Sequence, residues 1–577
     1  MKDNTGNKVH QLLTLASLFI FILIFLQYYI DREQFIYYWD FGAYWEFTTR
    51  LGTIIRENIS EGLLLTWNSI GRYDYNFTPG LIIALIFGDS IKSRHLYITS
   101  IAILYAIPSI ILLVSIIKKS LMGLHKVPND TLILTTVNFI VVLSTLIWAP
   151  VIKGYIDIVG LFPMLLAIYI YWTKILTKPQ THTVILISMV LVLPFIFRRW
   201  YAFSVISFLF TTSIIAIINS SKSIKKTIRP LFRIFQIGGI SLIILYLLFN
   251  ELFLSLFRNY SDMHDAYRPD FNLLKEIFRL FTFMGSFSTI LFLLGITFQT
   301  LSWLKHKQSS FISLFSLISL IFTFIIFFTA QNFGQHNYYL ILLPILYFQS
   351  YSIFTILTSL KNKRILSIAF TLIICFLASL NFIKTFIPIE FPPIVNKVLT
   401  TSPNFPYYRN DLSTITELFS KLETIDIQPH DKIYTLASSR LFNSSTVNSY
   451  CFFTHHNKDL CKHLNIPHSH VDKIDGLPHE LFKSRYIIVV SPNWSHLNPE
   501  RQLVVGYFLN NIIKQQEFGL NYKIVTSVTQ SLEDGSKIHI FEKKAEYTPQ
   551  QIDKIENFFF NKYPDYRKIF TSNQDRV

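Results

Sequence analysis

Charged residues are scarce in this chain. Asp, Glu, Lys and Arg make up 15% of its 577 residues, whereas soluble globular proteins have about 25%. Apolar runs of about 20 residues recur up to residue 385, and each is long enough to cross a bilayer as a helix. The low charge therefore excludes an ordinary soluble protein and predicts a multi-pass membrane protein.

The first apolar run, residues 12–30, is not followed by a small-residue cleavage site. It is also longer than the apolar core of a secretory signal peptide. We therefore expect it to be retained as the first membrane span.

The 52 basic and 36 acidic residues give a net charge of +16, but their placement does not predict nucleic-acid binding. The basic residues gather in short gaps at alternate ends of the apolar runs, for example in 118–126, 222–233 and 361–364. Cytoplasmic loops of membrane proteins show this positive-inside pattern. It predicts a cytoplasmic N-terminus and places the residues after the last span outside.

The expected fold class is an α-helical multi-pass membrane protein with a C-terminal extracytoplasmic α/β domain. We expect a membrane domain at 1–390, with outer-surface loops 31–94 and 251–280, then a linker at 391–407 and a soluble domain at 408–577. Hydropathy and charge together predict about eleven spans, at approximately 11–30, 95–117, 131–150, 156–173, 183–197, 200–218, 232–250, 281–302, 309–329, 337–358 and 365–385.

The C-terminal domain lacks a glycine-rich phosphate loop or nucleotide fingerprint. Short β-branched segments and an alternating hairpin pattern predict four strands, and apolar periodicity predicts helices between them. The expected strands are 432–436, 485–490, 522–528 and 537–541, and the expected helices are 410–424, 500–514 and one that starts at Thr548.

The chain has only three cysteines. Cys375 falls in the last apolar run and is expected to pack there. Cys451 and Cys461 lie in the domain expected outside, where thiols oxidise, so a disulfide between them is the favoured interpretation. Free thiols and a metal site with the nearby histidines stay open, although the histidine spacing fits no common zinc module.

Asp40 lies in a stretch rich in Tyr and Trp, residues 37–45, soon after the first apolar run. Carboxylates at a membrane surface are costly to desolvate, so they usually face a water-filled cavity and mark a functional site. The alternative is an interfacial aromatic belt with ordinary solvated acids. The local sequence leaves both interpretations open.

Arg198 and Arg199 lie in a very short outer gap between two spans, where the positive-inside rule disfavours arginine. A guanidinium binds a phosphate through two parallel hydrogen bonds, and a lipid can supply that phosphate. The alternative role is a snorkelling anchor to bulk headgroups. Other outer gaps also combine charged or polar residues with aromatics, and they contain Arg72, Asp74, Lys153, Asp157 and His336.

This pattern resembles the GT-C superfamily of integral-membrane glycosyltransferases, in particular the bacterial relatives of protein O-mannosyltransferases and the lipid A aminoarabinose transferase. That family has an acid in its first extracytoplasmic loop, matched by Asp40 in Tyr38-Trp39-Asp40-Phe41-Gly42, and often a second in the next, matched by Asp157. Its proline-centred helix resembles Asn76-Phe77-Thr78-Pro79. Phe41 replaces the second acid of the usual Asp-Glu pair, and Phe77-Thr78-Pro79 replaces His-Pro-Pro.

The resemblance implies a bacterial cytoplasmic (inner) membrane enzyme. It would move a sugar from a polyprenyl-phosphate carrier to an extracytoplasmic hydroxyl acceptor, with inversion. Asp40 would be the general base, and Asp157 would orient the sugar or the acceptor. The donor phosphate would be held, and its developing charge stabilised, by Arg198, Arg199, Lys153 and His336.

Contacts to the substrates are expected from the residues around Asp40, namely Tyr38, Trp39, Tyr44, Trp45, Arg72 and Asp74. A divalent cation between Asp40 and Asp157 stays open, but the sequence shows no full ligand set for it. A transporter or flippase of lipid-linked saccharides is the competing class, although the chain lacks the internal repeats typical of transporters. A polysaccharide polymerase is a third alternative.

Overall fold

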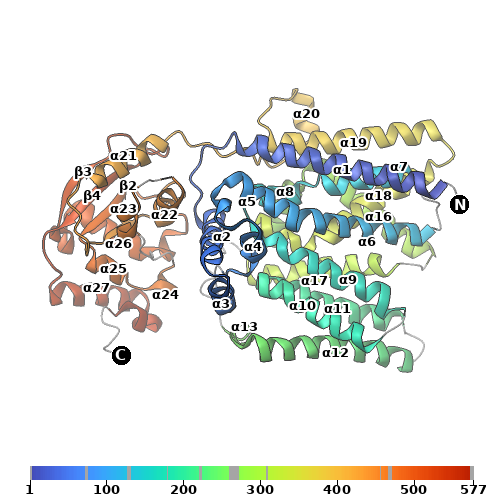
Figure 1. Cartoon of the computed structure of the whole chain (residues 1–577), viewed down its shortest axis with the longest axis horizontal. Helices are drawn as coiled ribbons and strands as arrows, with labels where there is room; N and C mark the ends of the chain where they lie inside the picture. Colours follow the sequence, from blue (N-terminus) through green and yellow to red (C-terminus); the bar gives the residue numbers. More distant parts are fainter. Residues whose placement is uncertain are drawn as a thin grey trace. The chain divides into compact units, whose positions relative to one another are not determined.

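The computed structural model describes residues 3–71, 76–125, 131–177, 180–219, 224–258, 272–306, 310–454, 457–464 and 471–571. These residues form two compact units, a membrane unit and a sheet unit (Figure 1). The membrane unit comprises the described residues of Met1–Glu33, Phe47–Arg258 and Asn272–Pro406. The sheet unit comprises Gln34–Glu46 and the described residues of Tyr407–Val577.

Among the described residues, ten helical stretches are long and apolar enough to cross a membrane, and the shorter apolar helix α10 (Thr181–Phe197) adds a further candidate. The ten stretches together with α10 coincide with the eleven expected spans, so the predicted multi-pass helical fold is confirmed. The helices of these stretches are α1 (Asp3–Ile30), α5 (Arg94–Ile101), α6 (Ile107–His125), α7 (Thr131–Val142), α8 (Thr145–Ile152), α9 (Leu161–Ile170), α11 (Tyr201–Asn219), α12 (Ile224–Leu248), α16 (Ser286–His306), α17 (Phe311–Ala330), α18 (Leu342–Ser359) and α19 (Arg364–Phe386), with the short 3₁₀ or π-helical segments η3 (Ala102–Ala106), η4 (Ile156–Gly160), η5 (Tyr171–Ile175) and η6 (Gln335–Ile341).

Helix α18 forms the centre of the membrane unit, and nearly all of its residues are buried. It packs closely against α16, because a Cβ on Gly295 of α16 would lie 1.8 Å from the carbonyl oxygen of Phe348. Small residues allow such close backbone approach between membrane helices.

Shorter helices connect the first two spans. They are α2 (Trp39–Glu57), α3 (Ile59–Ser69), η1 (Thr78–Gly80), α4 (Leu81–Phe87) and η2 (Gly88–Lys92). The second expected outer loop contains α13 (Asn250–Ser255) and α15 (Leu273–Met284), and the residues between Arg258 and Asn272 lie outside the described part of the chain.

The expected linker contains α20 (Pro393–Val398) and is held to the membrane unit by backbone hydrogen bonds. The amide of Ser286 donates to the carbonyl of Thr400 (2.9 Å), and the amide of Asn404 donates to that of Thr385 (2.7 Å). The Tyr29 hydroxyl donates to the carbonyl of Phe405 (2.7 Å). These bonds fix the path of the linker along α1, α16 and α19.

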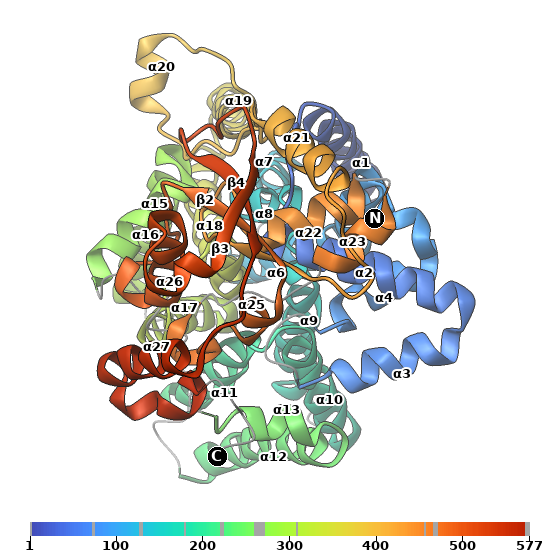
Figure 2. The same ribbon diagram turned by 90° about the vertical axis from the view of Figure 1, so that its left-hand side faces the viewer.

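The described residues of the sheet unit form one four-stranded sheet in the order β1-β2-β4-β3. Strands β2, β3 and β4 are labelled in Figure 2. Strands β1 and β2 are parallel, whereas β4 is antiparallel to both of its neighbours. All four strands coincide with the expected ones: β1 (Ile433–Leu436), β2 (Tyr486–Ser491), β3 (Tyr522–Ser527) and β4 (Lys537–Lys543).

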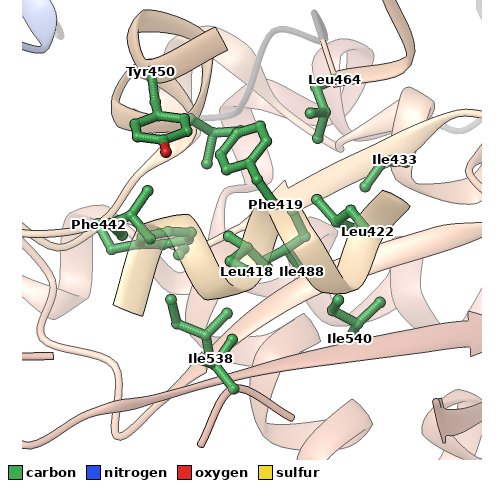
Figure 3. Close-up of a cluster of buried hydrophobic side chains, with 14 of the residues drawn as sticks. Leu418, Phe419, Leu422, Ile433, Phe442, Tyr450, Leu464, Ile488, Ile538 and Ile540 are labelled. Carbon is green, nitrogen blue, oxygen red and sulfur yellow. The ribbon is translucent and has the colours of Figure 1, made fainter. Parts of the chain in front are cut away.

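Helices cover both faces of the sheet. One face packs with α21 and α22 around Leu418, Phe419 and Ile488 (Figure 3). The other packs with α26 and α27 around Phe508 and Phe559. The helices are α21 (Leu412–Glu423), α22 (Ser444–Phe453), α23 (Lys458–Leu464), α24 (Asp472–Asp475), α25 (His479–Lys483), α26 (Leu503–Lys514) and α27 (Pro549–Lys562), with η7 (Pro499–Arg501), η8 (Glu517–Asn521) and η9 (Pro564–Phe570).

Residues 34–46 pack with the sheet unit, although their sequence position suggested the membrane domain. The amide of Gln34 donates to the Tyr407 carbonyl (2.9 Å), and the amide of Arg409 donates to the Gln34 carbonyl (2.8 Å). Ile36 is buried in the same hydrophobic cluster as Leu418 and Phe419. The stretch that carries Asp40 is therefore part of the sheet unit.

Candidate functional site

A buried carboxylate, Asp157, organises the polar cluster of the membrane unit. Its side chain is fully buried in η4. Arg198 Nε donates to Asp157 Oδ1 at 2.6 Å, and Trp200 Nε1 donates to the same oxygen at 3.1 Å. Because both donors meet one carboxylate oxygen, Asp157 fixes the orientation of the guanidinium and of the indole.

The local sequence explains why these side chains meet. Helix α10 ends at Phe197 and α11 begins at Tyr201, so Arg198 and Trp200 share one tight turn. The Arg198 guanidinium lies 4.2 Å from the centre of the Trp200 ring, a cation–π arrangement. Tyr201 fixes the turn on η4, since its hydroxyl donates to the Asp157 carbonyl at 3.0 Å.

His336 joins this cluster through aromatic stacking. Its ring stacks on Tyr155 with the centroids 4.4 Å apart and lies 5.0 Å from the Trp200 ring. The His336 side chain is therefore brought together with Arg198 and Asp157, three residues that the sequence singled out in separate gaps.

Lys153 is held beside the same segment. Its Nζ donates to Gln335 Oε1 at 2.9 Å, and Gln335 Nε2 donates to Asn404 Oδ1 at 3.0 Å. Burial lowers the pKa of the Lys153 ammonium to about 8, and the charge of Glu33 opposes that shift. An ammonium with such a pKa changes charge within the range of ordinary assay buffers.

Arg94 is a buried cation that the sequence analysis did not single out. It is 8% exposed, and its Nη2 donates to the Ile152 carbonyl at 3.3 Å. Gly154 has a φ of +86° and lies so close that an added Cβ would be 2.5 Å from Arg94 Nη1. The sequence signal that could have found Arg94 is its place at the outer start of the expected span 95–117.

Glu276 is a second residue that was missed. It is 4% exposed in α15 and accepts a hydrogen bond from the Phe333 amide at 3.3 Å. It also pairs with Arg279 at 3.4 Å. Glu276 thus fixes the segment that precedes His336.

The proline-centred segment Asn76-Phe77-Thr78-Pro79 lies at the end of α10. Thr78 Oγ1 donates to the Ile196 carbonyl at 3.1 Å, and Asn76 Nδ2 donates to the same carbonyl at 3.3 Å. It therefore contacts the chain two residues before Arg198. Arg199 is half-buried in that turn, and Arg72 and Asp74 lie outside the described residues.

Asp40 belongs to the sheet unit, where it is half-buried in the first turn of α2. The aromatic side chains around it pack within that unit: Tyr38, Tyr44 and Trp45 are buried. The Trp45 ring stacks on Phe453 with 3.6 Å between centroids. Trp39, the fourth expected substrate aromatic, is half-buried.

No protein-family model and no curated protein matches this sequence. Among solved structures, the chain is similar to the oligosaccharyltransferase of Archaeoglobus fulgidus tethered with an acceptor peptide, with 13% identity and a TM-score of 0.42 over 83% of this chain and 68% of that chain. The apo form of that protein gives 11% identity and a TM-score of 0.42, covering 85% and 70% of the two chains.

A third similar structure is AglB from Archaeoglobus fulgidus in complex with an inhibitory peptide and a dolichol-phosphate, at 11% identity and a TM-score of 0.40 over 83% and 69% of the two chains. This similarity concerns the fold alone, and it assigns no function to any residue of this chain.

Cys451 and Cys461 form a disulfide in the structure, with their Cα atoms 5.6 Å apart. It joins α22 to α23. Cys375 lies half-buried in α19. The described residues hold no group of three or more His, Cys, Asp or Glu side chains that could bind a metal ion, and His455 and His456 lie outside them.

Proposed function

We propose that this protein is a glycosyltransferase that moves a sugar from a polyprenyl-phosphate carrier to a hydroxyl of an extracytoplasmic acceptor, with inversion. The acceptor class is a cell-envelope glycan, lipid or protein. The observation that carries the proposal is a polar cluster in a multi-pass membrane protein: Arg198 pairs with the buried Asp157, His336 lies against Trp200, and Lys153 donates to the neighbouring Gln335. Ionisable residues at membrane depth are costly and mark functional sites.

The cations of this cluster suit the phosphate of the donor. Arg198 and Arg199 would bind its oxygens, and Lys153 would add a point charge. As the bond between the sugar and the phosphate oxygen breaks, negative charge grows on the phosphate, and cations already in place stabilise it. Asp157 would orient Arg198 for this task through the ion pair at 2.6 Å.

Asp40 would activate the acceptor. It would take the hydroxyl proton while the oxygen forms a bond to the anomeric carbon from the face opposite the phosphate. The carrier phosphate would leave with the electron pair of the broken bond. Trp39 would contact the sugar, because it is the least buried of the four aromatics.

The proposal requires the sheet unit to lie outside the cytoplasm, in a bacterial inner membrane with the N-terminus inside. The alternating basic gaps support this orientation. A single cysteine introduced within Glu542–Tyr547 should react with an impermeant reagent in intact cells. Reaction only after lysis would contradict both the orientation and the assignment of Asp40.

The decisive experiment incubates the purified protein with radiolabelled polyprenyl-phosphate sugars and follows release of the label from the carrier. Wild-type protein should discharge one donor, and Asp40→Asn should not. Asp31→Asn is the matched control, because Asp31 lies in the same expected loop with a side chain 68% exposed. Movement of intact donor across a vesicle membrane without discharge would instead indicate a flippase. Repeating the reaction with a chelator tests whether a divalent cation takes part.

A further inference from the structure

Trp39, the residue before Asp40, has an unusual backbone conformation. Its φ is +46°, a region that side chains other than glycine rarely adopt. Such a conformation persists only where the surroundings hold it, and it is found most often at functional sites. The contacts that hold Trp39 therefore bear on the role of its neighbour.

Two elements of the sheet unit hold Trp39. Its amide donates to Ser445 Oγ at 2.8 Å, and Ser445 lies in the first turn of α22. Its ring lies against His496, with the centroids 4.4 Å apart. His496 is fixed in turn, because its Nδ1 lies 2.8 Å from Ser438 Oγ and its amide donates to the Ser438 carbonyl at 2.9 Å.

The segment is anchored on both sides of Asp40. On the N-terminal side, Gln34 pairs with Tyr408 in a parallel bridge. On the C-terminal side, a Cβ on Gly42 would lie 2.5 Å from the Tyr37 carbonyl oxygen and 2.9 Å from Ser449 Oγ, so α2 starts in close contact with α22. Asp40 thus occupies a short span of chain whose two ends the sheet unit fixes.

We infer that the sheet unit positions Asp40 for proton transfer, with Ser445 and His496 acting through Trp39. Asp40 is in the first helical turn, so the backbone of Trp39 sets where its carboxylate points. The inference rests on the proposed function, since it takes Asp40 as the base. The inference gives the C-terminal domain the role of positioning Asp40, which neither the sequence nor the fold of that domain indicates.

Ser445→Ala tests the inference, because it removes the oxygen that accepts from the Trp39 amide. Turnover should fall about 10- to 100-fold, the scale expected when a catalytic group is displaced by about 1 Å. The Michaelis constant for the donor and the unfolding temperature should stay unchanged. Ser445→Thr keeps the hydroxyl and should restore turnover. Ser413→Ala is the matched control, because it also removes a serine hydroxyl from the sheet unit, one that donates to Gln530 Oε1.

A double-mutant cycle separates positioning from general damage. If Ser445 acts through Asp40, then Ser445→Ala should cause no further loss of turnover in an Asp40→Asn background. An equal loss in both backgrounds, or wild-type turnover by Ser445→Ala, would overturn the inference while leaving the proposed function intact. Wild-type turnover by Asp40→Asn would instead contradict the part of the proposed function that makes Asp40 the base.

Discussion

Asp157 and Asp40 are carboxylates in opposite surroundings. Asp157 is fully buried, and one of its oxygens accepts from both Arg198 and Trp200. Asp40 is half-buried at the start of a helix, and its aromatic neighbours do the packing. A buried, paired carboxylate is suited to orienting cations, whereas an accessible one can exchange a proton with a substrate.

Substitutions of Asp157 and of Asp40 should also differ in their effects on stability and on turnover. Removing one partner of a buried ion pair leaves an uncompensated charge, which destabilises the protein. A carboxylate in the first turn of a helix gains from the partial positive charge there but does little packing. Substitutions at Asp157 should therefore affect stability, and those at Asp40 should affect chemistry.

Asp40→Asn should have the largest effect. It keeps the size of the side chain but removes its basicity, so turnover should fall about 10²- to 10⁴-fold. Donor affinity and unfolding temperature should change little, because Asp40 is half-buried and is not one of the buried apolar residues of the core. Turnover and donor binding should be measured on the same purified variant.

A variant that loses donor binding together with turnover would assign Asp40 a structural or metal-binding role. Unchanged turnover would remove it as the base and would make Asp157 the next carboxylate to test. Asp31→Asn again serves as the control for a change of charge in the same loop.

Asp157→Ala should have the opposite effect to Asp40→Asn, because it should lower the stability of the protein. It strands the Arg198 guanidinium in a buried site, a loss that costs about 3–5 kcal/mol when a buried pair is broken. Thermal unfolding in detergent measures this loss. Asp89→Ala breaks the exposed pair between Asp89 and Arg56 and should change stability by at most about 1 kcal/mol. Equal effects of the two variants would contradict the structural role of Asp157.

The sequence was sufficient for features that depend on local pattern. Apolar runs and basic gaps located the spans, and short β-branched segments located all four strands, because both signals repeat along consecutive residues. The capping box at Thr548, with Gln551 three residues later, also forms as its spacing suggests.

Pairing between distant residues could not be read from the sequence. Asp157 and Arg198 are 41 residues apart, and the positions of their gaps predicted only that both lie on the same side of the membrane. The docking of residues 34–46 depends on Ile36 entering the core of the sheet unit, yet an apolar residue does not reveal its partner. Arg94 was overlooked because the sequence does not reveal that Gly154 lies against its guanidinium.

Replacing both Arg198 and Arg199 by Lys should have a smaller effect than the carboxylate variants. Lysine keeps the charge but loses the two-pronged hydrogen bonding to phosphate and the Nε donor to Asp157. The loss of hydrogen bonds between charged groups predicts a Michaelis constant for the donor raised about 10- to 100-fold. Arg56→Lys, in an exposed pair, is the control. A double variant with normal kinetics would show that the arginines are headgroup anchors.

The smallest expected effect concerns the pH dependence of donor binding. Burial lowers the pKa of Lys153 to about 8, so its ammonium is mostly charged at pH 7 and mostly neutral at pH 9. A phosphodiester donor keeps its single negative charge over this range. If only the charged form binds the phosphate, the Michaelis constant should rise between these values by at most about tenfold. Lys153→Arg stays protonated and should abolish the rise. Lys153 would be excluded from the phosphate site if the Michaelis constant of wild type did not change with pH, or if it rose equally in Lys153→Arg. The arginines would then be the cations of that site.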